Sequence, residues 1–261
     1  MSVLYNSPLW YSTLRADSNP SAREIVPVVM ELVHPKSVVD MGCGTAAWLA
    51  VFRAMGIENT IGVDGDYMDR SQLEIPVDHF VPADVTQPVK LSSRFDLAAC
   101  LEVAEHLPPE SAPVIVESLC RLAPVVLFSA AIPFQGGTHH VNEQWPEYWQ
   151  ALFARHGYQV IDCLRMRFWQ NPAVAWHYAQ NLMFYVDERQ IANYPALQRE
   201  QKDQTASVRR LIHPGRYLLT ADLSQFSFRQ VLKALPYFVC RFFRFHWHRW
   251  FGEKPLARQA K

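Results

Sequence analysis

The chain has 261 residues, a formal net charge of zero and a hydrophobic fraction of 49%. These values are typical of a soluble globular protein, and they exclude a disordered chain as well as one drawn to nucleic acid by a large net charge. The length allows one α/β domain with a substantial core and an appendage.

Cysteine use and the N-terminal residues indicate the compartment. Five cysteines are scattered along the chain without a CxxC pair, which argues against a disulfide framework or a structural zinc site and suits a reducing environment. Residues 1–15 lack the basic start and apolar core of a signal peptide, and no apolar run approaches the length of a membrane span. We therefore expect a cytoplasmic protein.

The first predicted helix covers residues 25–33, and either Asn19 or Ser21 can supply its cap. Pro27 should belong near the first turn, because proline is tolerated there and not in a helix interior. A short β-branched strand at residues 37–40 follows.

The later elements alternate between strands and helices. Apolar runs and period-two alternation predict strands at residues 60–63, 81–84, 95–102, 125–131, 158–164 and 182–186. Helical spacing predicts helices at residues 46–55, 110–122 and 145–153. With the first strand this makes a seven-stranded, doubly wound α/β sheet, whose ligands bind at the carboxyl ends of the strands.

The first strand stops at Asp40 and turns through Gly42 and Gly44 into the next helix. Because glycine has no side chain, such a turn lets the backbone approach a nucleotide-like ligand and aims the amides of a helix N-terminus at it. The strands downstream also end at acidic residues, namely Asp64, Asp84 and Glu102.

Over roughly residues 37–186 this succession resembles the class I S-adenosylmethionine-dependent methyltransferases. The resemblance implies a Rossmann-like sheet, S-adenosylmethionine as the cofactor and methyl transfer as the reaction. It implies that the turn with Asp40, Gly42 and Gly44 holds the methionine end of the cofactor. It also implies that Asp64 accepts hydrogen bonds from both ribose hydroxyls, a charge-assisted pairing that neutral side chains reproduce poorly.

The same resemblance assigns three further residues. Asp84 matches the position that contacts the adenine amino group, and Leu101 and Glu102 border the methyl group that is transferred. Ala46 is a departure, since it stands where the family often has a third glycine.

A dinucleotide-binding fold is the main alternative for the glycine turn. Residues 42–47 satisfy the pattern GxGxxA, and Asp64 lies at a suitable distance for a ribose. Asp40, directly before the turn, and the later acidic residue Asp84 argue against it. A further alternative is a glycine turn that binds no ligand. It is disfavoured because the three acidic residues at strand ends would then occur by coincidence.

Two loops offer a histidine that could remove a proton from a hydroxyl acceptor. Glu102, Glu105 and His106 form an E-x-x-E-H run after the fourth strand, and His139 and His140 follow the fifth strand. Both loops should open at the same rim, beside the methyl group. We predict that His140, His106 and Glu102 contribute to catalysis, with His140 or His106 as the base.

The E-x-x-E-H run also raises the hypothesis of a metal site. Glu102, Glu105 and His106 would share one helical face, and together with His140 they would suit magnesium or manganese. The run is similar to that of the small-RNA 3′-terminal 2′-O-methyltransferases, which add a later histidine, a role that His139 or His140 could fill. It also resembles quinone-biosynthetic O-methyltransferases. The alternative is helix capping, because acids are favoured at the positive end of the helix dipole.

Polar groups interleaved with aromatic rings follow the fifth strand and precede the last one. The polar residues of the first region fall within residues 135–145, and the aromatic residues of both regions are Trp145, Tyr148, Trp149, Phe168, Trp169, Trp176 and Tyr178. This mixture suits a sugar, whose hydroxyls need partners and whose C–H faces stack on rings. A resemblance to bacterial methyltransferases of surface-glycan synthesis favours the same acceptor. The alternative is that the aromatic residues only pack the sheet edge.

The sequence therefore predicts a methyltransferase that acts on a sugar or glycan hydroxyl. A quinone- or polyketide-like small molecule is the alternative acceptor, and RNA is disfavoured because the charge is neutral and the core has no basic stripe. A scaffold that binds the cofactor without catalysis is an alternative of another class.

The composition changes after residue 190, so we predict a methyltransferase domain at 1–190 and a linker with an amphipathic extension at 191–261. Residues 228–251 combine basic and aromatic side chains at helical spacing, and Pro236 should interrupt the helix. This pattern indicates peripheral contact with the inner membrane surface. Docking onto the catalytic domain or a second subunit is the alternative.

Overall fold

The computed structural model describes residues 8–203, 210–221, 232, 235–236 and 239–240. The chain divides into two compact units, Met1–Arg216 and Tyr217–Lys261. Most of the basic aromatic segment at 228–251 lies outside the described residues, so its membrane contact stays a prediction, as does the boundary at residue 190. Of that segment, residues 232, 235–236 and 239–240 are helical.

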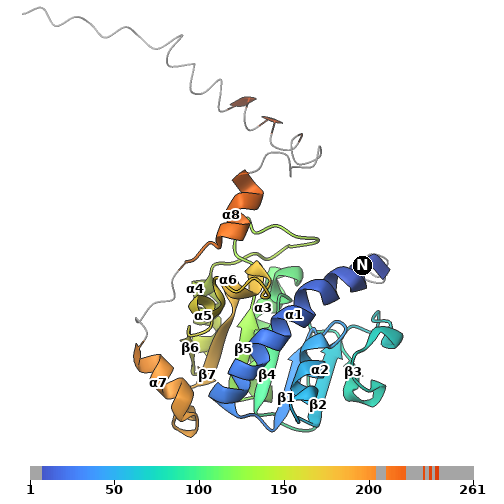
Figure 1. Ribbon diagram of the computed structural model, residues 1–261, viewed down its shortest axis with the longest axis vertical. Helices are drawn as coiled ribbons and strands as arrows, with labels where there is room; N and C mark the ends of the chain where they lie inside the picture. The colour runs from blue at the N-terminus through green and yellow to red at the C-terminus, as the bar shows by residue number, and fades with distance from the viewer. Residues whose placement is uncertain (1–7, 204–209, 222–231, 233–234, 237–238, 241–261) are drawn as a thin grey trace, which may run out of the picture. The chain divides into compact units, whose positions relative to one another are not determined.

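The first unit contains one sheet of seven strands, in the order β3-β2-β1-β4-β5-β7-β6 (Figure 1). The strands are β1 Ser37–Met41, β2 Asn59–Asp64, β3 Phe80–Pro82, β4 Leu97–Leu101, β5 Val125–Ser129, β6 Tyr158–Ile161 and β7 Met183–Asp187. β7 pairs antiparallel with β5 and β6, and the other pairs are parallel. The predicted seven-stranded Rossmann-like fold is confirmed.

Helices cover both faces of this sheet (Figure 1). They are α1 Pro8–Val33, α2 Ala47–Ala54, α3 Ala112–Leu122, α4 Pro146–Ala154, α5 Arg165–Phe168, α6 Trp176–Asn181 and α7 Pro195–Asp203. A further helix, α8 Pro214–Ala221, spans the boundary between the two units. Short 3₁₀ turns connect them, at η1 Arg70–Gln72, η2 Val77–His79, η3 Ala104–His106, η4 Pro109–Ser111 and η5 Ile191–Asn193. No described helix is long and apolar enough to span a bilayer.

Alternate residues of the central strands point into two separate apolar layers. In β1, Val38 packs with α1 and α2, whereas Val39 packs with α3 and α4. In β5, Leu127 belongs to the first layer and Phe128 to the second. Because both faces are covered, the strands read as continuous apolar runs, which is why the sequence predicts them well.

The first helix differs from its prediction, since α1 begins at Pro8 and contains both Pro20 and Pro27. Each proline removes one helical hydrogen bond. Both lie on the exposed side of α1, where water can satisfy the freed carbonyl groups. The opposite side buries Ile25 and Val29 completely, so packing overrides the local preference. The N-terminal half of α1 reaches the carboxyl ends of the strands, where the site lies.

Candidate functional site

One cavity of about 530 Å³ lies at the carboxyl ends of β1, β2 and β4. The predicted site residues that line it are Asp40, Gly42, Gly44, Asp64, Asp84, Leu101, Glu102, His106 and His140. Glu105, the remaining candidate, is fully buried beside two of them. The fold therefore brings the cofactor and catalytic candidates around a single space.

The glycine turn packs so tightly that side chains would not fit. Gly42 has φ +78°, and a Cβ there would lie 2.5 Å from the Val103 side chain. Gly44 has φ +54°, and a Cβ there would lie 2.7 Å from Leu14 of α1. Ala46, the departure from the family pattern, also adopts the left-handed conformation, with φ 60° at the start of α2. An alanine in this region is strained by about 1–2 kcal/mol relative to glycine.

Asp64 joins the ends of β1 and β2. Its Oδ2 accepts a hydrogen bond from the Gly44 amide at 2.8 Å. Its Oδ1 accepts from the Gly65 amide and from the Tyr67 hydroxyl, both at 2.6 Å. Burial raises the pKa of Asp64 above its usual value, although these three donors act in the opposite direction. The carboxylate is therefore oriented within the cavity wall.

Asp40 is 2% exposed and lies close to Asp64. Burial, together with repulsion from Asp64, raises the pKa of Asp40 to about 8. Two buried acids with raised pKa values favour a cationic ligand, because a positive charge would stabilise their ionised forms.

Glu102 follows β4 with φ 54°, which is unusual for a residue with a side chain. Its carboxylate accepts hydrogen bonds from the side-chain amides of Gln135, at 3.0 Å, and Asn181, at 3.1 Å. Gln180 donates in turn to both Gln135 and Asn181, at 3.0 and 3.1 Å. These three amide side chains are buried, so they hold the Glu102 carboxylate at the cavity wall.

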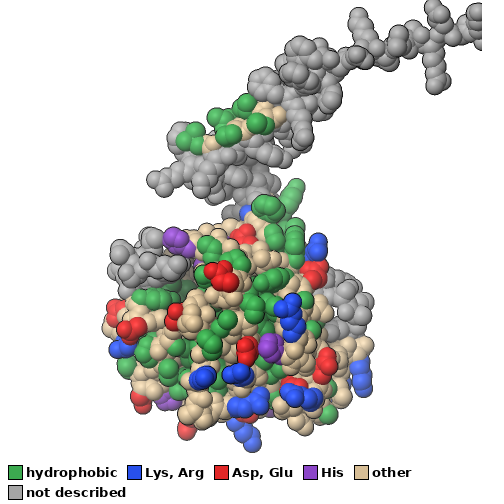
Figure 2. Space-filling model, turned by 180° about the vertical axis from the view of Figure 1, so that it is seen from behind, with side chains coloured by type: hydrophobic (Ala, Val, Ile, Leu, Met, Phe, Trp, Pro, Cys, Tyr) green, Lys and Arg blue, Asp and Glu red, His purple; other side chains and the backbone are tan. Residues whose placement is uncertain are grey.

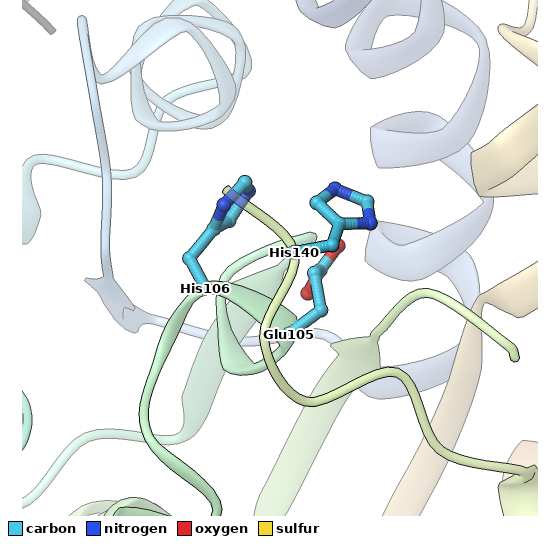
Figure 3. Close-up of side chains that lie close together, drawn as sticks. All are labelled: Glu105, His106 and His140. Carbon is cyan, nitrogen blue, oxygen red and sulfur yellow. The ribbon is translucent and has the colours of Figure 1, made fainter. Parts of the chain in front are cut away.

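Glu105, His106 and His140 form a cluster in which one possible ligand atom from each side chain lies within 4.8 Å of the other two (Figure 3). η3 carries Glu105 and His106, and the loop after β5 carries His140. The two imidazole rings are nearly perpendicular, with centroids 4.8 Å apart. Neither carboxylate oxygen of Glu105 has a hydrogen-bond partner of good geometry among the described residues. Glu102, the fourth candidate metal ligand, lies outside this cluster.

The cluster contains groups whose charged forms are disfavoured. Burial and the nearby Glu102 carboxylate raise the pKa of Glu105 well above its usual range. Burial, and to a smaller extent electrostatic repulsion from His140, lowers the pKa of His106 to about 4. His106 is therefore neutral near pH 7, with a nitrogen lone pair that can bind a cation, but it is a weak base.

The N-terminal half of α1 supplies part of the cavity wall that the sequence analysis missed, namely Trp10, Thr13, Leu14, Asp17 and Ser18. Their spacing of three and four residues is helical, but two prolines downstream conceal the length of α1. Among the aromatic residues proposed for the acceptor, Tyr178 lines the cavity. Trp149 and Phe168 pack in the core, as the alternative interpretation holds.

A family model described as a methyltransferase domain matches residues 18–178. A search of curated proteins found no match. Among solved structures, the sugar N-methyltransferase KedS8 from Streptoalloteichus sp. ATCC 53650 is 18% identical with a TM-score of 0.54, covering 68% of this chain and 91% of its own. CalS10, an amino pentose methyltransferase from Micromonospora echinaspora, is 13% identical with a TM-score of 0.51, covering 69% and 97%.

These solved structures share the fold at low sequence identity, and the family match covers more than half of the chain, including the glycine turn and the η3 run. The chain therefore belongs to this methyltransferase family and is a class I S-adenosylmethionine-dependent methyltransferase.

Proposed function

We propose that the enzyme transfers the methyl group of S-adenosylmethionine to a hydroxyl group of a sugar or glycan. The observation that carries this proposal is that one cavity is lined both by the buried acids Asp40 and Asp64 and by the His106–His140 pair. Acidic and basic side chains are interspersed over the face of the first unit in Figure 2. This fits an uncharged acceptor better than RNA.

The cofactor side of the cavity suits a cation. S-adenosylmethionine carries a sulfonium and an ammonium group, and Asp40 and Asp64 are the buried acids at the glycine turn. The Asp64 carboxylate would accept the ribose hydroxyls, where the Tyr67 hydroxyl now donates. Asp84 lies exposed at the rim, where the adenine amino group would be placed.

The acceptor side combines hydrogen-bonding groups with ring faces, as a sugar requires. Thr13, Asp17, Thr138 and His177 are polar groups of the wall, and Trp10 and Tyr178 are its aromatic rings. The Tyr178 hydroxyl hydrogen-bonds to Ser18 at 3.2 Å, which fixes one ring against α1.

In the proposed reaction, the acceptor oxygen attacks the methyl carbon in line with the bond to sulfur, and its proton passes to a base. His140 is better suited to this role than His106, because the pKa of about 4 makes His106 a weak base. Glu102, held by two amides, borders the same space. His140 is therefore the proposed base.

A divalent cation is a second candidate component of the site, because the carboxyl of Glu105 is fully buried and makes no hydrogen bond of good geometry among the described residues. Glu105, His106 and His140 would hold it, and one carboxylate with two imidazoles suits manganese better than magnesium. When bound, such a cation favours the ionised form of a hydroxyl group beside it.

The acceptor is tested by incubating the protein with S-adenosylmethionine and a panel of glycans, nucleotide sugars, quinones and polyketides. Mass spectrometry should show the gain of one methyl group in a sugar. A protein that binds the cofactor and methylates no acceptor would favour a scaffold instead.

Replacing Asp64 by Ala should weaken cofactor binding. The ribose hydroxyls would lose an ionised acceptor, and hydrogen bonds of this kind contribute about 1.5–3 kcal/mol. Calorimetry would measure the dissociation constant, with the surface variant Glu117→Ala on α3 as control. Equal affinities for Asp64→Ala and the unchanged protein would contradict the assignment.

The affinity for S-adenosylmethionine should rise with pH towards about 8 and then level off. Asp40 has a pKa of about 8 without ligand, and the cationic cofactor should bind the ionised form, so binding releases a proton. One released proton corresponds to about tenfold in affinity per pH unit. Calorimetry in buffers of different ionisation enthalpy counts the protons, and Asp40→Asn should abolish this release.

The raised pKa of Asp40 also predicts how the stability of the protein depends on pH. The folded-state pKa of Asp40, about 8, exceeds its ordinary value of 3.8. Asp40 therefore stabilises the fold below about pH 4, and this contribution is lost as the pH rises through about 8. Thermal unfolding should show a weaker decline over this range in Asp40→Asn.

Replacing His140 by Ala should lower turnover by about a hundredfold to ten-thousandfold, with cofactor affinity retained. His106→Ala is the comparison, and a larger loss in that variant would move the base to η3. A chelator separates base from ligand. Activity lost with EDTA and restored by manganese supports the cation, whereas activity that EDTA leaves intact supports His140 as base alone.

A further inference from the structure

Several groups of the loop between β5 and α4 hydrogen-bond to one carboxylate, that of Glu143. Its Oε2 accepts a hydrogen bond from the Phe134 amide at 2.7 Å. Its Oε1 accepts from the Gly136 amide at 2.6 Å and lies 2.9 Å from Nδ1 of His140. The side chains of His140 and Glu143 are 12% and 19% exposed, so their contact is partly buried, whereas the two bonds from the loop amides are exposed.

These contacts determine which ring nitrogen of His140 carries the proton. A main-chain amide can only donate, and the two amide bonds favour the ionised form of the Glu143 carboxyl, which is acceptor-only. The bond between this carboxylate and His140 then requires Nδ1 to be the donor. In a neutral imidazole with Nδ1 protonated, Nε2 has the free lone pair.

The position of the His140 ring is also restricted by its neighbours. A Cβ at Gly137 would lie 2.2 Å from Nε2 of His140, so the glycine leaves the room that this nitrogen occupies. The amides of Val141 and Asn142 donate to the carbonyl oxygen of Glu105 at 2.9 and 3.0 Å. The loop is thereby tied to η3, and Glu143 fixes the ring within the loop.

We propose that Glu143 is a positioning residue, which holds His140 as the Nδ1-protonated tautomer and leaves Nε2 free to take the acceptor proton or bind a cation. Its effect on turnover rests on the proposed role of His140. Its effect on the tautomer does not, because it depends only on the contacts of Glu143.

The direct test is the tautomer of His140 in the unchanged protein. Nitrogen NMR of histidine-labelled protein, with EDTA present and at a pH where the ring is neutral, distinguishes the two ring nitrogens. His140→Ala assigns the signal. We expect the proton on Nδ1 in the natural sequence and a shift of the population towards Nε2 in Glu143→Gln. A proton on Nε2 in the unchanged protein would overturn the proposal.

The kinetic test compares Glu143→Gln and Glu143→Ala with Glu117→Gln, which alters an exposed ion pair on α3. Loss of a carboxylate that orients a histidine typically costs about 10–100-fold in activity. We expect a fall of this size in kcat for both Glu143 variants, with the cofactor dissociation constant unchanged.

Glutamine also separates positioning of the ring from support of the loop. It keeps the size of the side chain but offers one acceptor to the two loop amides, so a fall in turnover in Glu143→Gln supports the proposal only when the tautomer of His140 shifts as well. Near-normal turnover in Glu143→Gln, or a fall in turnover with the proton still on Nδ1, would refute the proposal. If no sugar is methylated and the Nδ1 tautomer is observed, the proposed acceptor is wrong and the role of Glu143 stands.

Discussion

The hydrogen bond from the Gly44 amide to Asp64 joins the end of β1 to the end of β2 and keeps a second acid, Asp40, beside the first. The cost of burying two neighbouring carboxylates is visible in the raised pKa values of both. A cation would offset this cost by stabilising the ionised forms of both acids. The sulfonium cofactor carries positive charge, so the two buried acids favour its binding.

The Glu102 carboxylate, which lines the cavity, belongs to a hydrogen-bonded group of side chains from three segments that are distant in sequence. The end of β4 provides Glu102, the loop after β5 provides Gln135, and α6 provides Asn181. Glu102 adopts a left-handed backbone conformation, and two side-chain hydrogen bonds orient its carboxylate. The rim thus has fixed polar groups before any ligand arrives, which lowers the entropy lost on binding.

The His106–His140 pair shows how the same residue type acquires two characters. His106 is held in η3, where burial lowers its pKa to about 4. His140 lies in the neighbouring loop, where its Nδ1 is 2.9 Å from Oε1 of Glu143, the proposed hydrogen-bond acceptor. The environment, and not the residue type, therefore separates a neutral ligand or hydrogen-bonding group from a candidate base.

The sequence by itself determined the fold and the residues at the glycine turn and the strand ends that line the cavity. Buried parallel strands read as apolar runs, and the turn at Gly42 and Gly44 requires glycine because Val103 and Leu14 leave no room for a Cβ. Asp40 and Asp64 could be placed because the carboxyl ends of parallel strands meet at one edge of the sheet. These are local patterns, which a single chain displays without knowledge of its packing.

Only the tertiary structure decided the rest. It showed that α1 extends to Pro8 and lines the cavity, because burial of one helix face outweighs two prolines on the other. It separated Glu102 from the cluster of Glu105, His106 and His140. It also revealed the contacts of Glu143. Such contacts form between segments that are far apart in the sequence. The spacing of residues along the chain does not show which of these segments come together.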